Sequence, residues 1–304
     1  MKVVIAYPEK WETRPPEDVA RYNEKLRAIV PNVEIVIAPY DESEELRVLR
    51  GKPPYDEARK RAPEVTDAQR AAFTDAEAIL TLNLPFDMDK LAPKLRWVQS
   101  IGAGVAQLQS AGLEINNVTL TNAAGTAATP IAEFVLARLL EQWKRLPLYA
   151  DMQREQNWTP TYGRDLSGST LGIVGHGAIG AAVAKRAKAL GMHVLATKRT
   201  LTADLKDPSV DRFYAFNDMQ GLLAESDAVV LAAPESAETL NLFNAKNFSA
   251  MKKGAFFINV ARGTLVNEPE LIEALKSEHL SGAAIDVASV EPLPPANPLW
   301  TAPN

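Results

Sequence analysis

The sequence contains no cysteine and only three histidines among its 304 residues. Without cysteine there is no disulfide framework, no thiolate metal site and no cysteine nucleophile, and we expect no metal centre. No run reaches the roughly 18 apolar residues of a membrane-spanning helix, and the apolar start is too short for a signal peptide. The net charge of -5 argues against nucleic acid as the main partner. We therefore expect a cytoplasmic protein that binds neither membranes nor nucleic acid.

The remaining composition is that of a globular protein, with 46% apolar and 23% charged residues. Apolar runs typical of strands alternate with helical patterns, which predicts parallel sheets with crossover helices. The first candidate strands are 2–7, 33–38, 78–82 and 95–99, with helices at 17–29 and 67–73. We interpret the charged stretch 41–63, which carries Pro53-Pro54, as an exposed irregular segment.

The chain is longer than the roughly 150 residues of one domain, so we expect an α/β protein of two doubly wound parallel-sheet domains. The prediction is a flavodoxin-like substrate domain of residues 1–100 plus 291–304 and a Rossmann dinucleotide-binding domain of residues 101–290, with the active site in the cleft between them. A helix at 130–145, capped by Thr129, has an apolar face wider than a surface helix requires. We expect this helix and the arm that follows, 146–166, to form a homodimer.

The sharpest motif is a glycine-rich turn, Gly175-His176-Gly177-Ala178-Ile179-Gly180. A strand at 170–174 precedes it, and a helix over 178–190 and a strand at 193–197 complete a βαβ unit of about thirty residues. The first glycine permits the tight turn, the second lets the backbone approach a pyrophosphate, and the third lets helix and strand pack closely. We expect Gly175, Gly177, Ala178, Ile179 and Gly180 to bind a cofactor diphosphate at the helix N-terminus; the alternative is merely a tight turn.

The end of the second strand indicates which dinucleotide binds. NAD sites place Asp or Glu there for the ribose 2′-hydroxyl, but this strand ends Thr197-Lys198-Arg199-Thr200. Two cations and a hydroxyl would suit a 2′-phosphate, which guanidinium binds through paired hydrogen bonds. We therefore expect Lys198, Arg199 and Thr200 to select NADP (NADPH), with NAD less favoured; the alternative is an ordinary solvated strand end.

The position of the glycine motif narrows the class of dehydrogenase. L-lactate and malate dehydrogenases usually begin with it, and no tyrosine here is followed by Lys at the fourth position, as short-chain dehydrogenases require. From about Leu95 onward the sequence resembles the D-isomer-specific 2-hydroxyacid dehydrogenase family. The matching segments are 101–105, 172–180, 191–194, Ala233-Pro234, 251–263, 282–287 and 291–294. The stretch 291–300 is similar to the glyoxylate/hydroxypyruvate reductase branch.

The resemblance suggests where substrate and cofactor bind. The loop Gly102-Ala103-Gly104 exposes backbone N–H groups to an anion, and by resemblance it binds the substrate carboxylate. Arg262 follows an apolar strand at its carboxyl end, where α/β proteins bind ligands. By resemblance it grips the same carboxylate and polarises the ketone oxygen. The cofactor would also contact Pro234, Val260 and Asp286, the last of these at the nicotinamide carboxamide.

The resemblance also implies a proton donor. The glutamate at the place of Glu291 hydrogen-bonds a histidine in the resembled enzymes and raises its pKa, so that the imidazolium protonates the ketone. His176, His193 and His279 do not stand at the place of that histidine. We expect the natural chain to continue past Asn304, with the catalytic histidine within about ten residues.

These features predict an NADP-dependent oxidoreductase that transfers a hydride between the nicotinamide and a small 2-oxo acid or D-2-hydroxy acid, with glyoxylate or hydroxypyruvate favoured. Two alternatives stay open. Some transcriptional corepressors resemble this family and use dinucleotide binding as a switch, so fold and cofactor alone do not prove catalysis. Phosphoglycerate, formate or phosphite dehydrogenases are the other alternative, although Lys198-Arg199 disfavours their usual NAD-dependent members.

Overall fold

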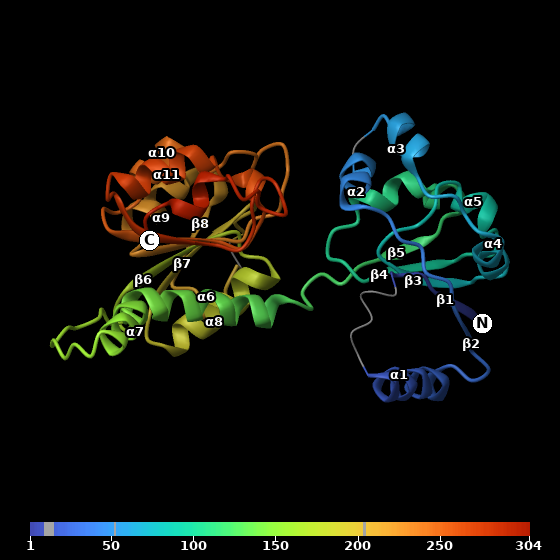
Figure 1. Cartoon of the computed structure of the whole chain (residues 1–304), viewed down its shortest axis with the longest axis horizontal. Helices are drawn as coiled ribbons and strands as arrows, with labels where there is room; N and C mark the ends of the chain where they lie inside the picture. Colours follow the sequence, from blue (N-terminus) through green and yellow to red (C-terminus); the bar gives the residue numbers. More distant parts are fainter. Residues whose placement is uncertain (9–14, 52, 203–204) are drawn as a thin grey trace. The chain divides into compact units, whose positions relative to one another are not determined.

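The computed structural model describes residues 1–8, 15–51, 53–202 and 205–304, which form two compact units. Unit 1 is Met1–Ala124 and unit 2 is Gly125–Asn304. Each unit has its own parallel β-sheet and its own helices (Figure 1). The expected fold of two parallel-sheet α/β domains is therefore confirmed. Among the described helices, none has the length and apolar character needed to cross a bilayer.

Unit 1 is built on a five-stranded parallel sheet in the order β2-β1-β3-β4-β5, which is the flavodoxin-like order. Its helices and strands are β1 (Lys2–Ile5), α1 (Pro16–Ile29), β2 (Glu34–Ile37), α2 (Glu44–Arg50), α3 (Asp56–Arg61), α4 (Asp67–Thr74), β3 (Ala78–Thr81), α5 (Met88–Leu91), β4 (Trp97–Ser100) and β5 (Thr119–Thr121). The apolar runs that predicted strands form its core, where Val4, Ile79 and Val98 are buried.

The stretch 41–63 contains two helices, so the expectation of an irregular segment was wrong. Ser43 Oγ accepts a hydrogen bond from Leu46 N–H at 3.2 Å and caps α2. Both helices have acidic residues in the first turn and basic residues in the last, which suits the helix dipole. Leu46 and Ala58 are buried. The pair Pro53-Pro54 therefore lies between two short helices, and the stretch is not irregular throughout.

The border between the units lies later than residue 100. Trp97 of β4 stands opposite Thr119 of β5, so the first sheet continues to Thr121 and unit 1 ends at Ala124. The segment 291–304 groups with unit 2, contrary to the expectation that it joins the first domain. The physical reason is contact with unit 2: Ala283 N–H donates to Asn304 O at 2.9 Å, and Leu299 packs on the core of unit 2.

Unit 2 is a six-stranded parallel sheet in the order β11-β10-β9-β6-β7-β8. Its elements are α6 (Ala128–Trp143), α7 (Leu146–Arg154), β6 (Thr170–Val174), α8 (Ala178–Ala189), β7 (His193–Lys198), β8 (Arg212–Ala215), α9 (Met219–Glu225), β9 (Ala228–Leu231), α10 (Ala245–Ala250), β10 (Ala255–Asn259), α11 (Glu268–Lys276) and β11 (Leu280–Ile285). α6 and α8 cover one face and α9, α10 and α11 the other (Figure 1). From β6 the chain adds β7 and β8 on one side, and it then crosses back to add β9 on the other side of β6. The place between β6 and β9 is therefore a topological switch point.

Helix α6 differs from the expected helix at its start and in the use of its apolar face. It begins at Ala128, and its N-cap is Ala127, which forms no side-chain cap, so the predicted Thr129 cap was wrong. Ala132, Val135 and Leu139 are buried in the core of unit 2. Much of the wide apolar face therefore packs within the unit itself.

The arm 146–166 begins with helix α7 and carries two strongly exposed aromatic side chains of unit 2. Trp158 is 95% and Tyr162 86% exposed. The arm is nevertheless anchored at its base, because Tyr149 Oη donates to Thr161 O at 2.9 Å and Arg164 N–H donates to Trp143 O at 2.7 Å. Its aromatic tip is thus presented outward from a fixed base.

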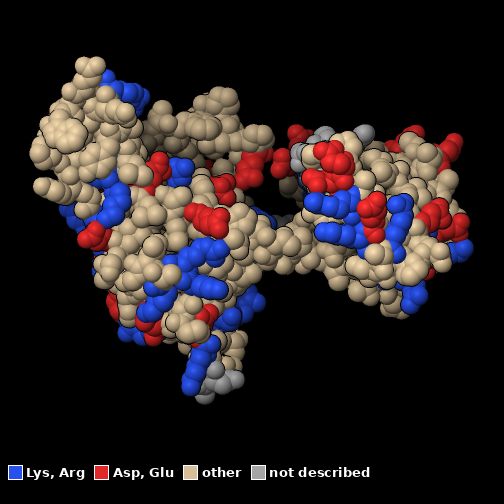
Figure 2. All heavy atoms as spheres, turned by 90° about the horizontal axis from the view of Figure 1, so that it is seen from below, with Lys and Arg blue, Asp and Glu red and all other residues tan. Residues whose placement is uncertain are grey.

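Charged side chains of both signs are interspersed over both units on the face drawn in Figure 2. This distribution accompanies a net charge of -5. Nucleic-acid partners usually require a stripe of one positive sign, and the face in Figure 2 does not present one.

Candidate active site

The carboxyl ends of five strands bring the predicted residues of unit 2 to one edge of its sheet. All six strands are parallel, so residues that follow each strand lie at the same edge. β6 is followed by Gly175, β7 ends at Lys198, β9 leads to Pro234, β10 to Arg262, and β11 to Asp286 and Glu291. In open α/β sheets, ligands bind outside the carboxyl ends at the switch point. The sequence placed these residues on strand ends correctly, although they span more than a hundred positions.

The glycine turn has the shape of a phosphate cradle. Gly175 has φ +104°, and a Cβ there would lie 2.6 Å from the Ala233 backbone. A Cβ on Gly180 would lie 2.3 Å from Gly175 O, whereas one on Gly177 would meet nothing described within 4 Å. Gly177 is the N-cap of α8 and supplies no side-chain cap. Among the described residues, the first N–H groups of α8, at Ala178, Ile179 and Gly180, have no hydrogen-bond partner, as is usual at the start of a helix.

Two hydroxyl groups that the sequence did not single out fix the turns beside this cradle. Thr197 is fully buried, and its Oγ1 accepts from Gly175 N–H at 2.9 Å. Thr239 is 2% exposed, and its Oγ1 donates to Pro234 O at 2.9 Å. Each is a polar residue at a strand end or in a turn beside apolar residues, and this pattern is the signal by which the sequence could have indicated it.

The end of β7 presents two cations with different surroundings. Lys198 Nζ donates to His176 O at 3.0 Å, so this lysine rests on the glycine turn. Arg199 is 71% exposed, with Glu238 at 3.8 Å from its Nη2. Thr200 is exposed as well. The strand end thus offers positive charge at the place where NAD sites hold a carboxylate.

Arg262 stands on a backbone turn that Asn259 holds in shape. Asn259 is 1% exposed and ends β10. Its Oδ1 accepts from Ala261 N–H at 3.0 Å, and its Nδ2 donates to Arg262 O at 3.1 Å. Val260 is buried in this turn, while Arg262 is exposed with Nη1 2.7 Å from Ala261 O. The guanidinium is therefore presented to solvent from a rigid base.

Glu291 lies on a turn that packs against the Arg262 turn. Its Oε1 accepts from Ala288 N–H at 2.8 Å. A Cβ on Gly263 would lie only 1.8 Å from the carbonyl carbon of Ala288, so the two turns touch backbone to backbone. Asp286 begins the second turn, and its N–H donates to Asn259 O at 3.0 Å. Arg262, Asp286 and Glu291 are thus carried by two turns in direct contact.

The loop of the first unit differs from the expectation at one residue. Gly102 N–H donates to Ser100 Oγ at 3.1 Å, so it is occupied within the loop. The carbonyl groups of Gly102 and Ala103 accept from Ala123 N–H and Asn122 Nδ2. Among the described residues, the N–H groups of Ala103 and Gly104 have no hydrogen-bond partner. Two of the three predicted residues therefore offer donors to an anion.

The three histidines have partners elsewhere in unit 2. His176 Nε2 is 3.2 Å from Asp207 Oδ2, and its ring packs edge-on against Phe213. Burial lowers the pKa of His176 despite the attraction of Asp207. His193 Nδ1 is 3.2 Å from Asp211, and His279 Nε2 lies 3.0 Å from Phe248 O. These contacts support the interpretation that none of the three acts on substrate.

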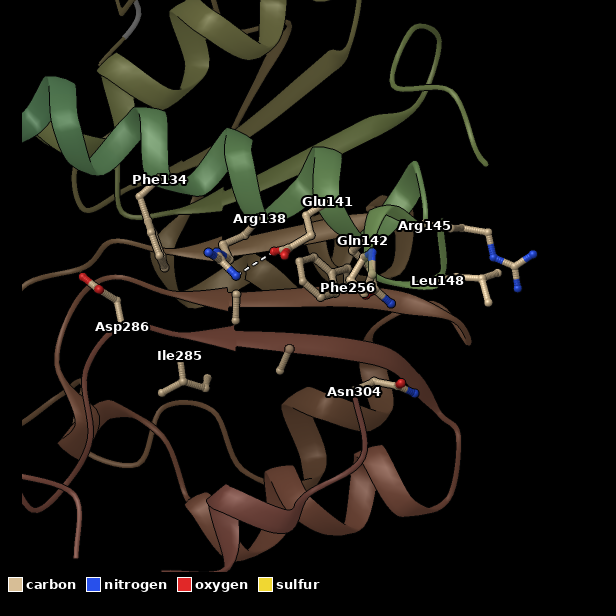
Figure 3. A pocket seen from close by; sticks show the side chains of 13 residues that line it. Phe134, Arg138, Glu141, Gln142, Arg145, Leu148, Phe256, Ile285, Asp286 and Asn304 are labelled. Atoms are coloured by element: carbon tan, nitrogen blue, oxygen red, sulfur yellow. Dashed lines mark hydrogen bonds and ion pairs between the residues drawn. The ribbon is translucent and has the colours of Figure 1, made fainter. Parts of the chain in front are cut away.

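A cavity of about 920 Å³ in unit 2 lies away from the glycine turn. It runs between α6 and the edge strand β11 (Figure 3). Arg138 and Glu141, which are hydrogen-bonded at 2.6 Å, project into it from α6, and Asp286 stands at one end. A second cavity of about 400 Å³ includes Asp286 and Glu291. Strand ends, and not cavity size, locate the candidate site. Groups of three or more metal-ligating side chains are not found among the described residues.

A glycine turn at the switch point of a parallel sheet defines a dinucleotide-binding protein. Residues 136–304 match the model of the D-isomer specific 2-hydroxyacid dehydrogenase NAD binding domain. The chain is 35% identical over 252 residues to glyoxylate/hydroxypyruvate reductase B of Klebsiella pneumoniae, covering 80% of this chain and 76% of that one. The chain therefore belongs to the D-isomer specific 2-hydroxyacid dehydrogenase family and is an oxidoreductase.

Solved structures agree with this assignment. A D-isomer specific 2-hydroxyacid dehydrogenase family protein from Aeromonas salmonicida superposes with a TM-score of 0.72 at 29% identity, covering 100% of this chain and 86% of that one. A D-isomer specific 2-hydroxyacid dehydrogenase from Xanthobacter autotrophicus, solved with NADPH and MES, gives a TM-score of 0.72 at 28% identity and covers 98% of this chain and 84% of that one.

Proposed function

We propose that the protein is an NADPH-dependent reductase of small 2-oxo acids, with glyoxylate or hydroxypyruvate as substrate. The observation that carries this proposal is the contact between the Arg262 turn and the Glu291 turn, at the same sheet edge as the glycine cradle. The relative from Klebsiella pneumoniae is named for both substrates. A cytoplasmic location stays a prediction.

The residues present fit a nicotinamide dinucleotide. Ala178, Ile179 and Gly180 would direct N–H groups at a diphosphate, with Gly177 leaving room for its approach. Pro234, Val260 and Asp286 follow neighbouring strands at the same edge. When bound, the cofactor supplies the hydride. The protein's task is then to hold the substrate carbonyl in place and to stabilise the charge that develops on its oxygen.

The preference for NADP over NAD rests on charge. Arg199 is exposed and only loosely paired with Glu238 at 3.8 Å, so its guanidinium is available to a phosphate. Lys198, at the end of β7, adds a second positive charge, and its Nζ is held on the glycine turn by the His176 carbonyl oxygen. The structure from Xanthobacter autotrophicus contains NADPH. We therefore assign the 2′-phosphate to Arg199, Lys198 and Thr200.

Each unit offers donors for a 2-oxo acid, and we propose a role for each set by itself. In unit 1, Ala103 and Gly104, with Gly102 beside them, offer backbone N–H groups that suit a carboxylate. In unit 2, Arg262 offers a cation that suits a carboxylate and stabilises an alkoxide that develops on a ketone oxygen. Glu291 lies on the neighbouring turn, and we propose that it orients the group that donates the proton to the ketone. The hydrogen bond that Glu291 accepts from Ala288 N–H holds its carboxylate against its own turn.

The test is reductase activity of the full-length protein with a panel of 2-oxo acids and both cofactors, followed by nicotinamide absorbance. Arg262→Ala should lower kcat/KM about 100-fold or more. Arg138→Ala is the matched control, because Arg138 is also exposed but pairs with Glu141 on α6. Cofactor binding without turnover of any 2-oxo acid would favour the regulatory alternative instead.

We also propose that the protein is a homodimer. The exposed side chains of the arm support this, since Leu146 at 51%, Trp158 at 95% and Tyr162 at 86% exposure are unusual for a surface without a partner. A groove of about 600 Å³ along the arm is lined by Tyr149, Met152 and Trp158 among others. A second copy of the chain would cover this surface.

A further inference from the structure

The turn that carries Glu291 is held from two sides. On one side it lies on the backbone of Gly263, the residue that follows Arg262. On the other side Ser289 N–H donates to Glu268 Oε1 at 2.7 Å. Ser289 belongs to the Glu291 turn, and Glu268 is the first residue of α11. The turn is therefore clamped between the Arg262 turn and a helix.

Glu268 is distinguished from its neighbour Glu270 by what it reaches. Both are acidic residues in the first turn of α11, so both suit the positive end of the helix dipole. Glu270 Oε2 accepts from Ala245 N–H at 2.6 Å, at the start of α10. Glu268 alone of the two contacts the Glu291 turn. A comparison of variants at Glu268 and Glu270 therefore distinguishes stabilisation of α11 from a role at the site.

We propose that Glu268 is a positioning residue of the active site, which fixes the turn 287–291 and thereby the place of Glu291 relative to Arg262. An N–H hydrogen bond to a charged carboxylate is stronger than one to a neutral acceptor, so the Ser289–Glu268 contact resists displacement. The turn otherwise has an exposed edge, since Ser289, Val290 and Glu291 are all exposed. Loss of the Glu268 contact frees that edge while leaving the Gly263 contact intact. The inference rests on the proposed function, in which Glu291 orients the proton donor.

The experiment compares Glu268→Ala, Glu268→Gln and Glu270→Ala in the full-length protein. Hydrogen exchange of the Ser289 amide should become about tenfold faster or more in Glu268→Ala. It should stay near the wild-type rate in Glu268→Gln, whose side-chain oxygen still accepts the bond, and in Glu270→Ala. With glyoxylate and NADPH, kcat should fall about tenfold in Glu268→Ala alone, because small misplacements at a reacting centre are costly. NADPH affinity should stay unchanged in all three variants.

Two results would overturn the proposal. One is an unchanged exchange rate at Ser289 in Glu268→Ala; the other is an equal loss of kcat in Glu268→Ala and Glu270→Ala, which would show a general effect on α11. Failure of the proposed function looks different: the wild type would then reduce no 2-oxo acid, while the exchange rates would still decide whether Glu268 holds the turn.

Discussion

Asn259 and Arg262 are joined by a hydrogen bond from the Asn259 side-chain Nδ2 to the Arg262 carbonyl oxygen at 3.1 Å. The same amide accepts from Ala261 N–H through Oδ1 at 3.0 Å. One buried side chain therefore closes the whole turn from which the guanidinium projects. The direction of the guanidinium depends on a residue that a substrate need not touch.

Replacing Asn259 with Ala should disturb the Arg262 turn. The backbone groups of Ala261 and Arg262 lose their partners, which costs about 1–3 kcal/mol of stability. The KM for the 2-oxo acid should rise about tenfold, with NADPH affinity unchanged. Asn247→Ala is the control, because Asn247 is 7% exposed and equally bonded, to Leu242 O and Gln220. Equal kinetic effects in both variants would contradict the prediction.

Replacing each of two glycines of the cradle with alanine should affect different properties: cofactor affinity in one variant and stability in the other. In Gly177→Ala the new Cβ meets nothing described within 4 Å, so melting temperature should stay the same while cofactor affinity falls about tenfold or more, because the methyl blocks the diphosphate. In Gly180→Ala the Cβ would lie 2.3 Å from Gly175 O, so stability should fall by about 1–3 kcal/mol. Calorimetry of binding and of unfolding distinguishes the two effects. Loss of stability in Gly177→Ala would refute the assignment of an open cradle.

Arg199→Ala should lower kcat/KM for NADPH at least tenfold, which is about 1.4 kcal/mol, and leave NADH nearly unchanged. The reason is loss of the guanidinium that meets the 2′-phosphate. Steady-state assays with each cofactor measure this ratio. Arg212→Ala is the control, since Arg212 is similarly exposed but pairs with Glu225 on α9. Equal losses with both cofactors would show that Arg199 does not contact the 2′-phosphate.

Asp227 should make the stability of the protein depend on pH in the acid range. Partial burial raises its pKa, but the hydrogen bond from Thr170 N–H and the ion pairs with Arg164 and Lys252 outweigh this, so the pKa lies below its usual range. A depressed folded-state pKa stabilises the protein above the unfolded value near about 3.9. That stabilisation is lost as pH falls through the folded value.

Asp227→Asn should therefore cost about 1–3 kcal/mol near pH 7 and progressively less below about pH 4. Urea unfolding at several pH values tests this. Asp75→Asn serves as the comparison, because Asp75 is exposed and its ion pair with Lys94 at 2.5 Å is screened by solvent. A constant difference between wild type and Asp227→Asn at all pH values would contradict the linkage.

The arm should hold the homodimer. Trp158→Ser combined with Tyr162→Ser removes its two most exposed aromatic side chains, and aromatic residues dominate interface energies. Light scattering at micromolar concentration should show a dimer for the wild type and a monomer for the double variant. Trp300→Ser, which alters an exposed tryptophan outside the arm, should stay dimeric. A wild-type monomer would refute the proposed assembly.

The sequence predicted the features that follow from local chemistry. A Cβ on Gly175 or Gly180 would collide with the backbone. Positions that require glycine for this reason can be recognised from the spacing of glycines in the sequence motif. The strands of unit 2 were readable because parallel strands buried on both faces are continuous apolar runs. The position of Arg262 after β10 was predictable for the same reason, since it follows such a run.

Features that depend on contacts distant in sequence were missed. The hydrogen bond of Asn304 to Ala283 places 291–304 in unit 2, and a linear pattern does not show it. Glu268 and Ser289 are joined only after α11 and β11 pack. Asn259 gave one signal, a polar residue closing an apolar run. The helices α2 and α3 were not predicted, because the charged residues and Pro53-Pro54 favoured an irregular segment.

Each unit is a continuous stretch of chain and completes its sheet without a strand from the other. During synthesis, residues 1–124 are therefore translated before residues 125–304. At about 5–20 residues per second, translation of unit 2 lasts on the order of ten seconds or more. Residues 1–124 have that time to bury apolar side chains such as Phe73, Leu84 and Val98, which are fully buried in the folded unit. The nascent chain then exposes one unfolded apolar core at a time, which limits aggregation on the ribosome.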